Sequence, residues 1–195
     1  MSNNNDYNSQ AQNLSEAGFT LVEAVVAILV LTIGMIATAA ALTFALEFGA
    51  LSKNVTGAKT AIVSMIEEIE TLRNSRRLEF SQIANVGSVD NTGAARTFTG
   101  FTTGFQAVSL APGEDGVNGT ADDLIDAGPD GVFGTADDFS NPGLVLSGLT
   151  RQVAVSSISP TIKKIEVRVR YTAAAGKVGE IGGVAYLNDE TRITR

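Results

Sequence analysis

The chain has 195 residues and a formal net charge of −7, and it contains neither cysteine nor histidine. This length accommodates one modest domain and an appendage, and the acidic balance argues against a protein that binds nucleic-acid phosphates. Without cysteine or histidine, the sequence excludes disulfides, thiol catalysis, serine triads and zincin-type metal sites. We therefore expect a protein that is not an enzyme.

The N-terminal region has a polar segment followed by an apolar one. Residues 1–18 are rich in asparagine and serine, and composition predicts no stable structure for them. Between Glu23 and Glu47 there are 23 uncharged residues, which as a helix reach roughly 34 Å, enough for a bilayer core of about 30 Å. A secretory signal peptide does not fit this order, because Gly18 precedes the apolar run. Residues 19–48 are therefore predicted to be a transmembrane helix, and a plain membrane anchor is the simplest alternative.

The six residues GFTLVE, from Gly18 to Glu23, lie where these two segments meet. They resemble the processing motif of type IV prepilins and type II secretion pseudopilins. The resemblance implies that a prepilin peptidase cleaves after Gly18 and methylates the new N-terminus, Phe19. It also implies that Glu23 pairs with the N-terminal amine of a neighbouring subunit and sets the axial register of a helical filament. A carboxylate in apolar surroundings is tolerated when an opposite charge pairs with it. Alternatively, Glu23 reaches the membrane surface without a partner.

The charges around the apolar segment differ from those of many prepilins. The leader has no lysine or arginine, and the first basic residues, Lys53 and Lys59, follow the span. The positive-inside rule would place the N-terminus outside, whereas the motif requires a cytoplasmic N-terminus before cleavage. We follow the motif and predict a single-pass inner-membrane protein whose head is periplasmic and then part of a pilus or pseudopilus. The absence of proline from the span favours a minor subunit, since many major pilins carry one there.

Beyond the span, apolar residues recur at steps of three and four, as in one stripe of an amphipathic helix. They are Leu51, Val55, Ala58, Ile62, Met65, Ile66, Ile69 and Leu72. Residues 49–80 are therefore predicted to continue the helix. One helix from about Phe19 to Arg77 would be roughly 88 Å long.

From residue 81 to residue 195 the composition shifts to glycine, threonine, serine and valine, which predicts a β-rich head. Strand-like runs occupy residues 97–110, 144–158, 162–172 and 182–187. The run IEVRVRY at 165–171 alternates strictly, so one face of that strand is predicted to be apolar and the other charged. The expected fold is α+β, with the helix stripe packed on a small antiparallel sheet. The family resemblance implies the pilin-like arrangement of these parts.

Two near-copies of one segment form a duplicated loop at residues 113–139. GEDGVNGTADDL at 113–124 and GPDGVFGTADDF at 128–139 are identical at nine of twelve positions. Their carboxylates are Asp115, Asp122 and Asp123 in the first copy, and Asp130, Asp137 and Asp138 in the second. Glycines let the backbone turn so that carbonyls can face these carboxylates, and an all-oxygen site suits a hard cation, Ca²⁺ more than Mg²⁺. Asx turns without a metal are the structural alternative.

The second copy resembles the calcium loop near the C-terminus of major pseudopilins. That resemblance implies side-chain ligands at Asp130 and Asp137 and carbonyl ligands at Val132 and Thr135. The equivalent positions of the first copy are Asp115, Asp122, Val117 and Thr120. Asp123 and Asp138 are candidates for further ligands or, alternatively, for turn caps.

The sequence as a whole predicts a minor pilin that takes part in the assembly or initiation of a type IV pilus. Its expected partners are the prepilin peptidase, other pilin subunits, the inner-membrane assembly platform and the membrane, with no nucleic acid. A minor pseudopilin of a type II secretion system is the first alternative. A membrane-anchored calcium-binding module that does not assemble is the second.

Overall fold

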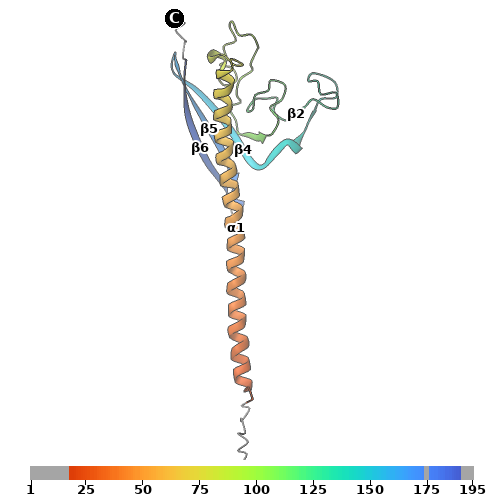
Figure 1. Ribbon diagram of the computed structural model, residues 1–195, viewed down its shortest axis with the longest axis vertical. Coiled ribbons are helices and arrows are strands. Elements are labelled where there is room, and N and C mark those ends of the chain that lie inside the picture. The colour runs from red at the N-terminus through yellow and green to blue at the C-terminus, as the bar shows by residue number, and fades with distance from the viewer. Residues whose placement is uncertain (1–17, 174–175, 190–195) are drawn as a thin grey trace, which may run out of the picture. The chain divides into compact units, whose positions relative to one another are not determined.

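The computed structural model describes residues 18–173 and 176–189 (Figure 1). The elements in chain order are α1 (Leu21–Asn74), η1 (Phe80–Gln82), β1 (Gln106–Ser109), β2 (Ile125–Asp126), β3 (Phe139–Ser140), η2 (Pro142–Leu144), β4 (Val145–Ser159), β5 (Ile162–Thr172) and β6 (Val178–Asn188). The chain divides into two compact units, Met1–Ala45 and Leu46–Arg195. Apart from Gly18, the expected leader lies outside the described residues.

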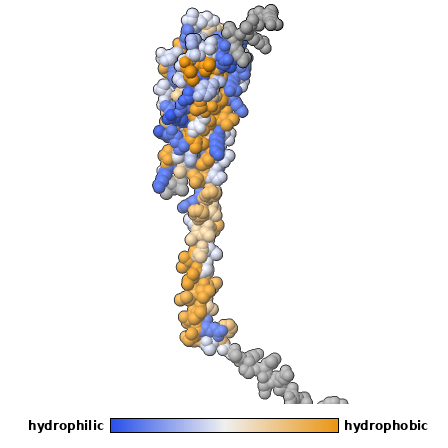
Figure 2. All heavy atoms as spheres, turned by 90° about the vertical axis from the view of Figure 1, so that its left-hand side faces the viewer, coloured by the Kyte–Doolittle hydropathy of each residue, from blue (hydrophilic) through white to orange (hydrophobic). Residues whose placement is uncertain are grey.

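The helix α1 belongs to the first unit as far as Ala45. Its side chains there are exposed and mostly apolar (Figure 2). Hydroxyls of Thr38 and Thr43 donate to the carbonyls of Gly34 and Ala39, so these polar groups find partners within the helix itself. Among the described residues, α1 is the helix that is long and apolar enough to cross a membrane.

The part of α1 in the second unit buries one stripe, as the spacing predicts. Its buried residues are Ala58, Ala61, Ile62, Met65, Ile69 and Leu72. They share one hydrophobic core with Ile165, Val167 and Val169 of β5. The pilin-like architecture, a long helix on an antiparallel sheet, is therefore confirmed.

The helix ends at Asn74, three residues before the predicted Arg77. Arg76 has a φ of 56°, in the left-handed region that terminates helices. The N–H of Arg77 donates to the Leu72 carbonyl at 2.9 Å, and the N–H of Arg76 donates to the Arg73 carbonyl at 3.0 Å. These two bonds form a Schellman motif, which satisfies carbonyls that the last turn would otherwise leave unpaired.

The main sheet has the order β1-β4-β5-β6, and every pairing in it is antiparallel. β5 has the bounds that its alternation predicts. Its inner side chains are buried, while Glu166 on the outer face forms ion pairs with Lys164 and Arg168. At Gly183 of β6 the helix comes so close that an added Cβ would lie 2.5 Å from Ile62 Cγ2.

The predicted strand at 97–110 is much shorter in the structure, where only Gln106–Ser109 is a strand. The residues before it pair elsewhere. The N–H of Phe101 donates to the Ala84 carbonyl, and its own carbonyl accepts from Val86, both at 3.0 Å. Phe101 is fully buried, so core packing holds this segment against residues 84–86.

Lys163 of β5 is, with Arg151 of β4, one of two charged residues of the sheet that are buried on its inner face. Its ammonium donates to the carbonyls of Phe80, Ser81 and Ile83, at 2.5, 3.2 and 2.8 Å. Burial lowers the pKa of this lysine. The side chain thereby ties η1 and the residue after it to the sheet.

Candidate functional site

The expected processing site lies directly before α1. Gly18, Phe19 and Thr20 are non-helical and exposed, and the helix begins at Leu21. Thr20 caps the helix, because its Oγ1 accepts a hydrogen bond from the Glu23 N–H at 3.2 Å. The Gly18–Phe19 bond is therefore in exposed chain, where a peptidase can reach it without unwinding a helical turn.

Glu23 lies in the first turn of α1, where the helix dipole favours a negative charge. The side chain is exposed. Within residues 18–173 and 176–189, the Glu23 carboxylate forms neither a hydrogen bond nor an ion pair. Its charge is therefore available to a partner from another molecule.

The first Asp loop (residues 113–124) is organised around two of its carboxylates. Asp122 Oδ2 accepts from the Asp115 N–H at 3.0 Å, and Asp115 Oδ1 accepts from the Val117 N–H at 2.7 Å. Thr120 Oγ1 donates to Asp122 Oδ1 at 2.6 Å. Gly113 has a φ of +66°, and a Cβ there would lie 2.5 Å from the Asp122 carbonyl oxygen, so this close turn requires glycine.

The second Asp loop (residues 128–139) repeats this arrangement. Asp137 Oδ2 accepts from the Asp130 N–H at 3.4 Å, and Asp130 Oδ1 accepts from the Val132 N–H at 2.8 Å. Thr135 Oγ1 donates to Asp137 Oδ1 at 2.5 Å and lowers the pKa of that carboxyl. A Cβ at Gly128 would lie 2.6 Å from the Asp137 carbonyl oxygen. The sequence repeat is therefore also a repeat of backbone geometry.

The last carboxylate of each pair caps a turn. Asp123 accepts from the Gly119 N–H at 2.9 Å, and Asp138 accepts from the Gly134 N–H at 2.7 Å. Both carboxylates accept hydrogen bonds from backbone N–H groups, which is the arrangement expected if these two residues cap turns.

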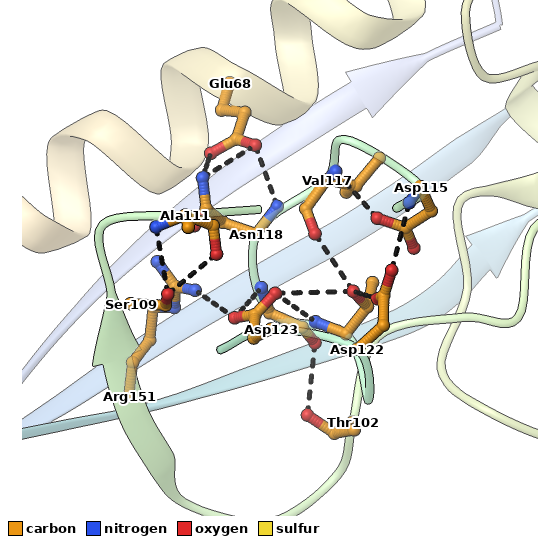
Figure 3. Close-up of polar contacts among 12 residues, drawn as sticks. Glu68, Thr102, Ser109, Ala111, Asp115, Val117, Asn118, Asp122, Asp123 and Arg151 are labelled. Atoms are coloured by element: carbon orange, nitrogen blue, oxygen red, sulfur yellow. Dashed lines mark hydrogen bonds and ion pairs between the residues drawn. The ribbon is translucent and has the colours of Figure 1, made fainter. Parts of the chain in front are cut away.

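Polar contacts to Thr102, Arg151 and Glu68 hold the first Asp loop against the rest of the head (Figure 3). Asp123 forms an ion pair with Arg151 of β4 at 3.5 Å, and both side chains are only 6% exposed. Glu68 of α1 accepts from the backbone N–H of Asn118 at 2.9 Å and also from its side-chain amide. Burial lowers the pKa of Arg151, while the Asp123 and Glu68 charges raise it. Chain order separates Arg151 from Asp123 by 28 residues, and no sequence signal pairs them.

Two side-chain oxygens of the first loop are buried without a hydrogen-bond partner, Asn118 Oδ1 and Asp115 Oδ2, and Asp115 is the one of the two residues that can carry a negative charge. Burial, together with the Asp122 and Asp123 charges, raises the pKa of Asp115 to about 6. Asp115 and Asp122 line one cavity of about 470 Å³, which Arg77 and Arg96 also line.

The described part of the chain has no group of three or more acidic side chains arranged to hold a metal. A cation in the first loop would therefore take carboxylate oxygens from Asp115 and Asp122 and its other ligands from carbonyls or water. Oxygen ligands of mixed kind are the usual set for Ca²⁺, whereas Arg77 and Arg96, which line the same cavity, are a competing source of positive charge.

The comparison with known families identifies the N-terminal region. Residues 13–39 match the model of the prokaryotic N-terminal methylation motif. No curated protein and no solved structure matches the chain significantly. The chain thus carries the motif of type IV pilin and pseudopilin precursors, as the residues from Gly18 to Glu23 indicate, on a pilin-like architecture.

Proposed function

We propose that this chain is a minor pilin, a structural subunit that takes part in the assembly or initiation of a type IV pilus. The methylation motif at residues 13–39 is the observation that carries this proposal. The prepilin peptidase cuts after Gly18 and methylates Phe19. The apolar part of α1 then anchors the subunit in the inner membrane, with the head in the periplasm, until the assembly platform adds it to the filament.

The Glu23 carboxylate, which has no partner among residues 18–173 and 176–189, supports the assembly step. Cleavage creates a cationic amine on Phe19, and in a filament this amine from one subunit neutralises Glu23 of the next. Burial of Glu23 among apolar helices then costs less, because the charge is paired. The helix dipole and the Thr20 cap are already present in the single chain. Assembly would add the positively charged partner of Glu23.

Mass spectrometry of the mature protein from its native host tests the processing step. We expect a chain that begins at N-methylated Phe19. A mature protein that still begins at Met1 would refute the proposal.

Replacement of Glu23 tests the assembly step. Glu23→Ala is expected to abolish incorporation into sheared filaments while cleavage after Gly18 continues. Glu47→Ala is the matched control, since Glu47 is the exposed glutamate at the other end of the uncharged run, and it should incorporate normally. If Glu23→Ala leaves surface display and interactions unchanged, the chain is a membrane-anchored module that does not assemble. The genes that lie next to the gene for this chain would distinguish a pilus system from a type II secretion system.

We also propose that the first Asp loop binds Ca²⁺ through Asp115 and Asp122. The buried Oδ2 atom of Asp115 supports this, because ionisation there at neutral pH leaves a buried carboxylate oxygen without a hydrogen-bond partner. A bound cation would supply the missing charge. With no cysteine in the chain, a cation would also restrain a glycine-rich loop that disulfides cannot hold.

Thermal unfolding of residues 46–195 in millimolar Ca²⁺ and in EGTA tests this proposal. At a hundredfold excess over Kd, Ca²⁺ should stabilise the head by about 2.7 kcal/mol. Asp115→Asn should remove the calcium effect and keep the acceptor for the Val117 N–H, whereas the matched Asp130→Asn in the second loop should retain the effect. Identical melting curves in Ca²⁺ and EGTA would refute calcium binding.

A further inference from the structure

The two Asp loops share one backbone geometry but have opposite surroundings. Val117 of the first loop is 2% exposed and belongs to the hydrophobic core, whereas its counterpart Val132 is 55% exposed. Asp123 pairs with Arg151 in the interior, whereas Asp138 forms no ion pair within the described residues. The positions through which the first loop packs onto the head therefore face solvent in the second loop.

The three positions at which the copies differ increase the apolar character of the second loop. Asn118, which is tied to Glu68, is replaced by Phe133, and Leu124 is replaced by Phe139. Phe139 is 50% exposed. At the third position, Pro129 replaces a glutamate and fixes its own φ angle. Phe133 is half-buried. An exposed aromatic side chain such as Phe139 on a stiff loop is typical of protein–protein contacts.

The second loop is also held firmly at its base. β2 and β3 pair antiparallel on its two sides (Figure 1), with Ile125 opposite Ser140. Asn141 donates from its side chain to Asp126 at 3.0 Å and from its backbone to the Leu124 carbonyl at 2.8 Å. With the internal hydrogen bonds of the Asp130 turn, the loop is preorganised, which reduces the entropy lost on binding.

The surroundings of the first loop indicate what kind of surface would bind the second loop. Around Gly119, a Cβ would lie 3.4–3.5 Å from side chains of Val153, Met65 and Phe101, and the guanidinium of Arg151 lies beside this apolar seat. The complementary surface for the second loop is therefore an apolar seat next to a cation.

We propose that the second Asp loop docks onto the head of a neighbouring filament subunit. Val132, Phe133 and Phe139 enter an apolar seat on that head, and Asp138 pairs with an arginine or lysine at its edge. This inference rests on the proposed function, because it takes the partner to be another subunit with an N-terminal methylation motif.

Photo-crosslinking of the full chain in its native host tests the docking. The chain has no cysteine, so Val132→Cys can be labelled at one position with a benzophenone maleimide and irradiated in isolated filaments. The expected product joins this chain to the head of another motif-bearing subunit. Val86→Cys is the matched control, because Val86 is 52% exposed, and it should not give this product.

Incorporation of loop variants provides the second measurement. Val132→Asp and Asp138→Lys are expected to lower the amount of the protein in sheared filaments by about tenfold or more, as for the loss of a central contact. Val86→Asp should leave incorporation unchanged. Unaltered melting temperatures of all three variants would show that the loss is not due to unfolding.

The outcomes separate the docking proposal from the proposed function. If the unlabelled chain is found in filaments, but position 132 gives no crosslink and both loop variants incorporate normally, docking is refuted and the filament function stands. A crosslink only to a second copy or to a protein outside the filament refutes the choice of partner. If the unaltered chain never enters filaments, both proposals fail.

Discussion

Asp123→Ala should destabilise the head far more than Asp138→Ala, although the two residues occupy equivalent positions of the repeat. Asp123 pairs with Arg151 where both side chains are 6% exposed. Removal of one partner from a buried pair costs about 3–5 kcal/mol, because the other charge remains buried. We use the lower end of this range, because the negative charge of Glu68 still partly compensates the Arg151 charge. The lost acceptor for the Gly119 N–H adds about 1 kcal/mol, for a total of about 4 kcal/mol.

Asp138→Ala removes an exposed turn cap and no ion pair within the described residues. Water can replace the lost acceptor, so we expect a loss of about 0.5–1 kcal/mol. Urea unfolding of residues 46–195, which contain every buried core residue described, measures both changes. The double variant Asp123→Ala/Arg151→Met should recover part of the stability, since it removes the orphaned charge. Equal losses for the two alanine variants would refute the assignment of the ion pair as the anchor of the first loop.

Three further predictions concern the same head. The pKa of Asp115 is about 6 in the fold against 3.8 ordinarily, so the folded protein retains a proton that the unfolded chain has lost, and metal-free stability should rise as pH falls from 7 to 4. Asp115→Asn should reduce this rise in urea titrations; an unchanged pH profile would contradict it. Lys163→Met should lower the free energy of unfolding by about 1–3 kcal/mol, because buried carbonyls lose their donor, and an unchanged urea midpoint would show that water serves them. Gly183→Val should lower it by about 1–3 kcal/mol through a clash with Ile62, while Gly182→Val, with 3.5 Å to the nearest atom, should lower it less; equal effects would exclude the clash.

The regular elements of the head could be predicted from periodicity, because they bury one face each. Steps of three and four identify the stripe of α1, and strict alternation gives the bounds of β5. The short β1 could not be predicted in the same way. Phe98 and Phe101 are as apolar as strand residues, but their backbone does not enter the sheet. The backbone of Phe101 pairs with Ala84 and Val86, and the backbone of Phe98 bonds to the Asn91 side chain.

The functional motif is local in sequence, and the other contacts of the site are not. Residues 18–23 carry the recognisable part of the N-terminal methylation motif without any need of the fold. The pairing of Arg151 with Asp123 requires β4 to pass beneath the first loop, which no spacing encodes. The position of Lys163 on the mostly apolar inner face of the sheet depends on carbonyls about 80 residues earlier in the chain. The different surroundings of two nearly identical loops likewise come from tertiary packing alone.

The duplicated loop has a consequence for how this chain can change over evolutionary time. In the first copy, packing and the ion pair with Arg151 restrict which substitutions the fold tolerates. The second copy inherits a self-sufficient turn but contributes little to the core, so selection for stability acts on it weakly. Val132, Phe133 and Phe139 can therefore vary between strains without loss of the fold. A duplication of this kind gives a chain a surface loop whose side chains can be replaced while its backbone turn still forms.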